Sequence, residues 1–122
     1  MESPHKGKTG LRRLFNAFAY SYAGLRAAYQ YEDAFRQEFW LAVLLIPLAC
    51  FLPSSGIGKA LMIASVLLVL IIELINSAIE ATVDRISLEN HSLAKRAKDI
   101  ASAAVLISLL NMLTVWALVL FA

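Results

Sequence analysis

The chain has 122 residues, of which 60% are hydrophobic and only 16% are charged. It is too apolar for a soluble domain of this size, so the composition indicates an integral membrane protein with one small domain over 1–122. The formal net charge is only +2, which gives no electrostatic support for binding to nucleic acid.

The segment at about 10–30 is predicted to form an amphipathic helix. Its apolar residues recur at helical spacing on one face, and they are Leu11, Leu14, Phe15, Phe18, Tyr22 and Leu25. Arg12, Arg13 and Asn16 lie away from that face. This pattern is typical of a helix that lies on a membrane surface. A helix packed against membrane spans has the same pattern, so the sequence leaves both interpretations open.

Three apolar runs follow, and each is predicted to form a transmembrane helix. They cover about 34–52, about 60–82 and about 100–121, and the last contains no charged residue. About 20 residues are needed to cross a hydrocarbon core of about 30 Å. Arg36 and Glu38 fall inside the first run, where their long side chains can reach the membrane interface. The predicted fold class is therefore an all-α membrane protein, with three transmembrane helices and an N-terminal surface helix.

Positive charges are concentrated in two segments, one before the first span and one between the second and third. The first segment contains Lys6, Lys8, Arg12, Arg13, Arg26 and Arg36, and the second contains Arg85, Lys95, Arg96 and Lys98. The connector between the first two spans has only Lys59, and the C-terminal end has no Lys or Arg. The excess of positive charge on cytoplasmic loops then predicts that the N-terminus and the second loop are cytoplasmic.

The second span carries a polar stripe. At about 100° per residue, Glu73, Asn76, Glu80 and Asp84 fall within one narrow strip of an α-helix. An ionisable group at membrane depth costs about 2.5–3.5 kcal/mol on insertion scales, so it is rarely retained without a function. The stripe is therefore the first candidate functional site.

Three groups of polar residues converge on the predicted cytoplasmic side. They are Glu32 with Glu38, the stripe itself, and a third group made of Glu89, Asn90, His91, Lys98 and Asp99. Carboxylates beside cations suit a Mg²⁺–nucleotide complex, because hard oxygen ligands hold the metal ion and Lys or Arg neutralises phosphate. The deeper carboxylate of Glu73 is a candidate general base. Hydrogen bonding between helices of an assembly and a proton or ion pathway remain open as alternatives to catalysis.

No common nucleotide-binding motif is present. The chain has neither the G-x-x-x-x-G-K-[ST] loop nor a glycine-rich kinase loop, and none of its five glycines lies near the stripe. If the protein transfers a phosphoryl group, it uses neither of the common nucleotide folds.

Four segments match a known pattern in order and spacing, at 24–28, 32–38, 73–85 and 97–104. Together they resemble the prokaryotic integral-membrane diacylglycerol kinases of the Gram-negative type. The resemblance implies a homotrimer in the bacterial inner membrane, with active sites shared between subunits at the cytoplasmic interface. It also implies transfer of the γ-phosphoryl group of Mg-ATP to the hydroxyl group of diacylglycerol, which gives phosphatidic acid.

The resemblance also assigns roles to individual residues. Glu73 would be the general base with Asn76 beside it, and Glu32 and Glu80 would hold the metal ions. ATP would be contacted by Arg13, Tyr20, Glu32, Glu80, Glu89, His91, Lys98 and Asp99. The lipid substrate would be contacted by Arg13, Glu38, Glu73 and Ser102. Ser87 and Asn90 depart from the glycine and the aromatic residue usual in the family's nucleotide loop.

Two other functions are compatible with parts of this sequence. Undecaprenol kinases of Gram-positive bacteria share the scaffold, but they resemble an N-x-R-I-H pattern where this chain has Ala34-Phe-Arg-Gln-Glu38. A non-enzymatic membrane assembly or ion-pathway subunit would explain the polar stripe. It would not explain why carboxylates and cations gather on the same predicted face.

Overall fold

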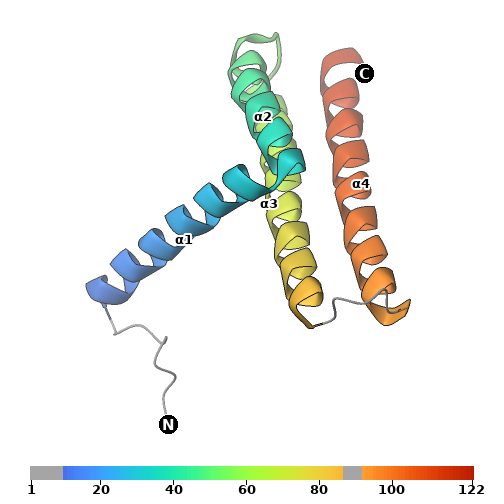
Figure 1. The fold of residues 1–122 in the computed structure, drawn as a ribbon. Helices are drawn as coiled ribbons and strands as arrows, with labels where there is room; N and C mark the ends of the chain where they lie inside the picture. Colours follow the sequence, from blue (N-terminus) through green and yellow to red (C-terminus); the bar gives the residue numbers. More distant parts are fainter. Residues whose placement is uncertain (1–9, 87–91) are drawn as a thin grey trace.

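The computed structural model describes residues 10–86 and 92–122, and this part of the chain forms four helices (Figure 1). They are α1 (Leu11–Tyr31), α2 (Asp33–Phe51), α3 (Gly56–Ile86) and α4 (Ser92–Phe121). The all-helical architecture predicted from the sequence is confirmed.

Helices α2, α3 and α4 are each long and apolar enough to cross a membrane. α3 has 31 residues, which at 1.5 Å per residue gives a length of about 46 Å. A hydrocarbon core is only about 30 Å thick, so one or both ends of α3 extend beyond it. The helix begins before the predicted span at 60–82 and continues past it, through Asp84 and Arg85.

The central helix is α3, which packs against both α2 and α4. In the described part of the chain, no Cα atom of α2 lies within 8 Å of a Cα atom of α4. The core is formed by Ala42 from α2, by Val66 and Val69 from α3, and by Met112 from α4. The indole N–H of Trp116 donates to the carbonyl oxygen of Met62 at 3.2 Å, which ties α4 to the first half of α3.

The connection between α2 and α3 is closed by hydrogen bonds and tight packing. Lys59 Nζ donates to the carbonyl oxygens of Cys50 at 2.9 Å and Leu52 at 2.7 Å. These hydrogen bonds satisfy carbonyl acceptors at the end of α2 that lack a helical partner. A Cβ atom at Gly58 would clash with Ser54 Oγ of the connection and lie 2.9 Å from Val119 Cγ1 of α4. Glycine at this position therefore lets α4 approach the start of α3.

Helix α1 projects away from the other three helices (Figure 1). Ala28 is the only residue of this helix that is buried. The apolar side chains predicted to share one face are exposed, including Leu11 at 74% and Phe15 at 72%. Over 11–18 that apolar face therefore does not pack against the spans of its own chain, whereas Leu25 lines hollows against α2 and α3.

Candidate active site

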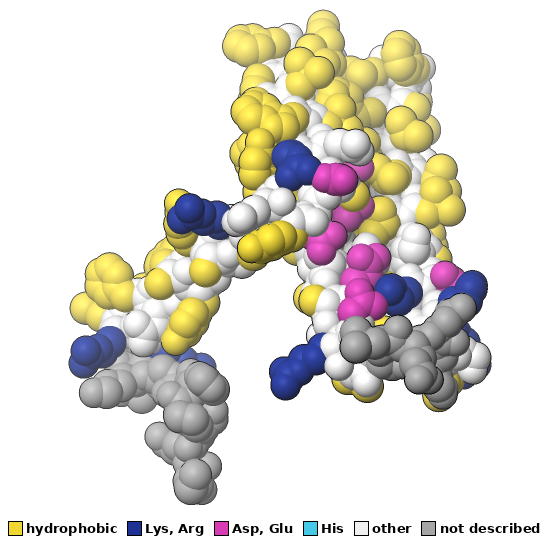
Figure 2. All heavy atoms as spheres, in the orientation of Figure 1, with side chains coloured by type: hydrophobic (Ala, Val, Ile, Leu, Met, Phe, Trp, Pro, Cys, Tyr) yellow, Lys and Arg dark blue, Asp and Glu magenta, His cyan; other side chains and the backbone are white. Residues whose placement is uncertain are grey.

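Four carboxylates come together around α3. Glu32 joins α1 to α2, and Glu38 lies near the start of α2. Glu73 and Glu80 lie on α3, and the other three carboxylates are all close enough to Glu73 for their charges to act on it. Figure 2 shows the acidic side chains as a band along one face, running from the junction of α1 and α2 toward the lower end of α3. Like charges repel one another, so such a cluster favours the binding of a cation.

Glu73 is the most deeply buried of these carboxylates. Only 4% of its surface is exposed, whereas Glu32, Glu38 and Glu80 are half-buried. Within the described ranges, no Lys or Arg forms an ion pair with it. An ionisable residue inside a membrane helix that has no partner of opposite charge indicates a functional site.

Asn76 lies one helical turn from both Glu73 and Glu80. Its amide nitrogen Nδ2 donates to Glu80 Oε1 at 3.3 Å, as side chains four residues apart on a helix commonly do. The amide oxygen Oδ1 is buried and has no hydrogen-bond partner among the residues that the structure describes. A buried acceptor without a partner costs about 1–3 kcal/mol. Asn76 therefore orients the Glu80 carboxylate and offers one more oxygen at the same place.

Glu32 reaches the cluster because the chain bends at this residue. It is the only residue between α1 and α2, and its backbone is extended, with φ −116° and ψ 106°. Its backbone N–H still donates to the carbonyl oxygen of Ala28 at 2.9 Å. The bend places the Glu32 side chain at the rim of a groove between α1 and α3.

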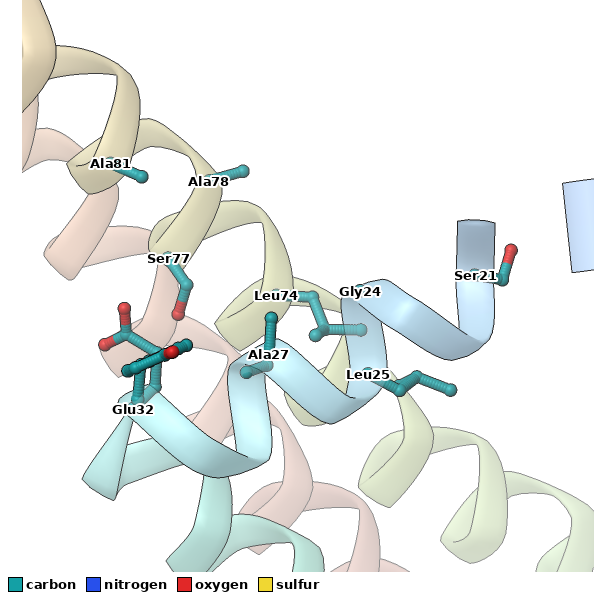
Figure 3. Close-up of a pocket in the computed structure, with 11 residues that line it drawn as sticks. Ser21, Gly24, Leu25, Ala27, Glu32, Leu74, Ser77, Ala78 and Ala81 are labelled. Atoms are coloured by element: carbon teal, nitrogen blue, oxygen red, sulfur yellow. The ribbon is translucent and has the colours of Figure 1, made fainter. Parts of the chain in front are cut away.

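This groove has a volume of about 770 Å³ and an almost entirely apolar lining (Figure 3). The residues that line it from α1 and the junction are Ser21, Gly24, Leu25, Ala27, Ala28, Tyr31 and Glu32, and those from α3 are Leu74, Ser77, Ala78 and Ala81. Figure 3 shows Glu32 and Ser77 at one end of the groove and Ser21 at the other. An apolar groove with a carboxylate at its end suits an amphipathic molecule such as a lipid.

The groove residues Ser77, Ala78 and Ala81 were not identified from the sequence. They belong to the same run as the polar stripe, but they lie on a neighbouring face of α3. Their small size is what leaves room beside α1. Small residues spaced three and four apart could have indicated a close approach of another helix.

Lysine side chains lie at the Asp84 end of the polar stripe, where α4 begins. Lys98 Nζ donates to Asp84 Oδ1 at 2.7 Å, which joins the start of α4 to the end of α3. The charge of Glu80 also acts on Lys98. Asp99 is paired with Lys95 at 2.6 Å, one turn away on the same helix. Lys98 therefore links the Asp84 end of the stripe to α4 and lies close enough to Glu80 for the two charges to interact.

Other predicted site residues are not brought to the cluster within one chain. Arg13 and Tyr20 are exposed on the part of α1 that projects away from the bundle. Ser102 is exposed on α4. Glu89 and His91 lie outside the described residues, as do Ser87 and Asn90.

The carboxylate cluster fits a divalent cation that brings phosphate ligands with it. None of the four carboxylates forms an ion pair in the described part of the chain, and the unpaired Asn76 Oδ1 adds a neutral oxygen. No group of three or more His, Cys, Asp and Glu side chains within 10–86 and 92–122 could hold a metal ion alone. Mg²⁺ is commonly held by one or two carboxylates together with oxygens of a substrate phosphate.

Comparison with known proteins gives a consistent result. Residues 19–120 match the family model described as prokaryotic diacylglycerol kinase. The chain is 56% identical over 118 residues to the diacylglycerol kinase of Pseudomonas aeruginosa, covering 97% of this chain and 96% of that relative. It is 51% identical over 113 residues to the diacylglycerol kinase of Haemophilus influenzae, covering 93% and 96%. It is also 48% identical over 114 residues to the diacylglycerol kinase of Escherichia coli, covering 93% of each.

Proposed function

The chain belongs to the prokaryotic diacylglycerol kinase family, and we propose that it phosphorylates diacylglycerol to phosphatidic acid at the cytoplasmic face of the bacterial inner membrane. Diacylglycerol kinase activity follows from the family match over 19–120 and from the relatives that bear this name. At the level of residues, the observation that carries the proposal is the buried Glu73 with three further carboxylates around it. These residues stand beside an apolar groove of a size suited to lipid.

In this proposal Glu73 is the general base. Its carboxylate accepts the proton of the lipid hydroxyl group while that oxygen forms a bond to the γ-phosphorus of ATP. The bond between the γ-phosphorus and the bridging oxygen breaks, and ADP leaves. Phosphoryl transfer depends mainly on positioning and on neutralising charge, so one base and a few charged side chains are sufficient.

Glu32 and Glu80 are proposed to hold divalent metal ions, which we assign as Mg²⁺. A metal ion held there would neutralise negative charge on the phosphate oxygens. Asn76 fixes the orientation of Glu80 through its hydrogen bond. Lys98, together with Asp99, is assigned to the nucleotide, and Glu38 and Ser102 are assigned to the lipid. The assignments of Glu89 and His91 to the nucleotide rest on the resemblance alone.

The protein is proposed to act as a homotrimer with sites completed by neighbouring subunits. Arg13 and Tyr20 are assigned to ATP and Arg13 also to the lipid, yet the part of α1 that carries them projects away from the bundle. In addition, α4 packs against α3 alone and exposes large apolar side chains such as Leu113. Both observations are explained if other subunits and lipid surround the chain.

Helix α1 is proposed to lie on the cytoplasmic surface of the membrane. Its apolar face is exposed in the isolated chain, and Arg12 and Arg13 are available for anionic headgroups. The N-terminus is assigned to the cytoplasm because of the excess of Lys and Arg before α2 and between α3 and α4.

The function is tested with the purified protein in detergent. Transfer of phosphate from labelled ATP is measured with and without Mg²⁺, with diacylglycerol and undecaprenol offered separately. We expect Mg²⁺-dependent transfer to diacylglycerol. Preferential transfer to undecaprenol would reassign the substrate, and no transfer to either lipid would contradict the proposed kinase function and favour a non-enzymatic membrane role.

A further inference from the structure

The chain changes direction between α1 and α2 at a single residue. α1 ends at Tyr31 and α2 begins at Asp33, so only Glu32 lies between them. The Glu32 N–H donates to the carbonyl oxygen of Ala28 at 2.9 Å, and its own carbonyl oxygen accepts from the Arg36 N–H at 3.1 Å. The backbone of Glu32 is therefore hydrogen-bonded to both α1 and α2. The φ and ψ of Glu32 therefore set both the angle between the two helices and the direction of its side chain relative to each of them.

Three aromatic side chains join α1 to α2 beside this junction, and we call Tyr29, Phe39 and Trp40 the aromatic clasp. The indole N–H of Trp40 donates to Tyr29 Oη at 2.9 Å. The Phe39 ring is edge-on to Tyr29, with centroids 5.6 Å apart and an interplanar angle of 84°. It is also edge-on to Trp40, at 5.4 Å and 86°. These are favourable distances and orientations for aromatic pairs.

Arg36 strengthens the attachment of Tyr29 to α2. Its guanidinium group donates to the Tyr29 carbonyl oxygen at 2.7 Å and lies 5.8 Å from the centroid of the Tyr29 ring. It also forms an ion pair with Asp33. Few other contacts fix α1, since Ala28 is its only buried residue. The aromatic clasp and Arg36 therefore provide most of the specific contacts that set the angle of α1.

We infer that the aromatic clasp positions Glu32 for binding of the metal–nucleotide complex, an inference that rests on the proposed function. Glu32 stands at one end of the groove near Ser77 (Figure 3), and its charge acts on Glu73. If the clasp opens, α1 can turn about Glu32, and the carboxylate moves relative to α3. The clasp residues line a different hollow, of about 390 Å³, which contains none of the four carboxylates. They are positioning residues and do not act on the substrate directly.

Two conservative substitutions test this inference. Tyr29→Phe and Trp40→Phe each remove the hydrogen bond between the helices but keep an aromatic ring. Binding of Mg²⁺ with a non-hydrolysable ATP analogue is expected to weaken about two- to tenfold, the factor that corresponds to loss of one hydrogen bond. The Mg-ATP concentration for half-maximal transfer is expected to rise by the same factor, while that of diacylglycerol stays unchanged. The double variant is expected to be no weaker than either single variant, because both remove the same bond.

The matched control is Trp116→Phe. It also removes an indole hydrogen bond, the one to the Met62 carbonyl oxygen at 3.2 Å, but near the opposite end of α3. We expect unchanged binding of the Mg²⁺–ATP analogue. Because the chain has only two tryptophans, this variant leaves Trp40 as the sole indole. Adding Tyr29→Phe to it is expected to shift the Trp40 fluorescence emission, which reports the clasp without any nucleotide.

Three results would overturn the inference while the wild-type protein is active. One is unchanged binding of the Mg²⁺–ATP analogue in both single variants. Another is a double variant whose weakening is the product of the two single effects. The third is that the variants lose thermal stability or membrane association without any change in binding of the Mg²⁺–ATP analogue. That result would show that Tyr29 and Trp40 only anchor the chain at the membrane interface. If the wild-type protein itself transfers no phosphate to diacylglycerol, the proposed function fails, and the inference fails with it.

Discussion

Both halves of α3 are largely apolar, but they differ in whether their buried polar side chains have hydrogen-bond or ion-pair partners. In the first half, Met62 and Val69 are almost fully buried. The hydroxyl group of the buried Ser65 donates to the Met62 carbonyl oxygen at 2.7 Å. In the second half, Glu73 is buried with no ion pair and Asn76 Oδ1 has no partner in the described chain. Local rules of packing and pairing are commonly broken where a protein binds or reacts, which is why we place the proposed site in the second half.

The largest effect is expected from Glu73→Gln, which keeps the shape of the side chain and removes its basicity. Loss of a general base typically costs about 10²–10⁴-fold in rate, so turnover is expected to fall by that factor. Assembly and nucleotide binding are expected to remain close to wild type. The measurements are phosphate transfer, size-exclusion chromatography in detergent and binding of an ATP analogue. Loss of the proposed trimer with the rate per assembled protein intact would show instead that Glu73 holds helices together.

Glu80→Gln is expected to affect metal binding more than the rate at saturation. The substitution removes one negative charge and keeps an acceptor for the Asn76 amide nitrogen. The Mg²⁺ concentration for half-maximal activity is expected to rise about 10–100-fold, as is common when the surroundings of a metal are altered. A Mg²⁺ titration at fixed ATP measures this, and an unchanged half-maximal concentration would contradict the assignment of Glu80 to the metal.

The membrane helices could be predicted because their signal is local. Apolar runs of sufficient length identify membrane-capable helices, and α2, α3 and α4 occupy those runs. Helical spacing alone was also enough to place Glu73, Asn76 and Glu80 on one strip of α3. Both predictions use only the order of residues within one element.

The contacts between elements could not be predicted in the same way. The Trp40–Tyr29 hydrogen bond depends on the angle at Glu32, and no periodicity in the sequence specifies that angle. The sequence places Trp40 near the start of the first predicted span and indicates no partner for it. Likewise, the small side chain of Ser77 gave no sign that α1 would cover that face of α3. Such features depend on how helices meet, which local patterns do not determine.

The packed half of α3 is tested by a pair of glycine substitutions. Gly58→Ala would place a Cβ atom in a clash with Ser54 Oγ and 2.9 Å from Val119 Cγ1, whereas a Cβ atom at Gly56 meets nothing within 4 Å. Overpacking typically costs about 1–3 kcal/mol, so Gly58→Ala is expected to lower the free energy of unfolding by that amount. Gly56→Ala is the control and is expected to leave it unchanged. The transfer rate per folded molecule is expected to stay at the wild-type value in both, since neither residue lies near the carboxylates.

The smallest effect is expected at the boundary of the functional half, where Asp84 pairs with Lys98 at 2.7 Å. Both side chains are more than a third exposed, so Asp84→Asn is expected to lower the free energy of unfolding by only about 0.2–1 kcal/mol. Its rate and its ATP dependence are expected to match the wild-type protein. Lys98→Met breaks the same ion pair and also removes the cation assigned to the nucleotide. The ATP concentration for half-maximal transfer is therefore expected to rise in Lys98→Met but not in Asp84→Asn. An equal rise in both variants would mean that Lys98 acts only by holding α4 to α3, and the functional half would then end at Glu80.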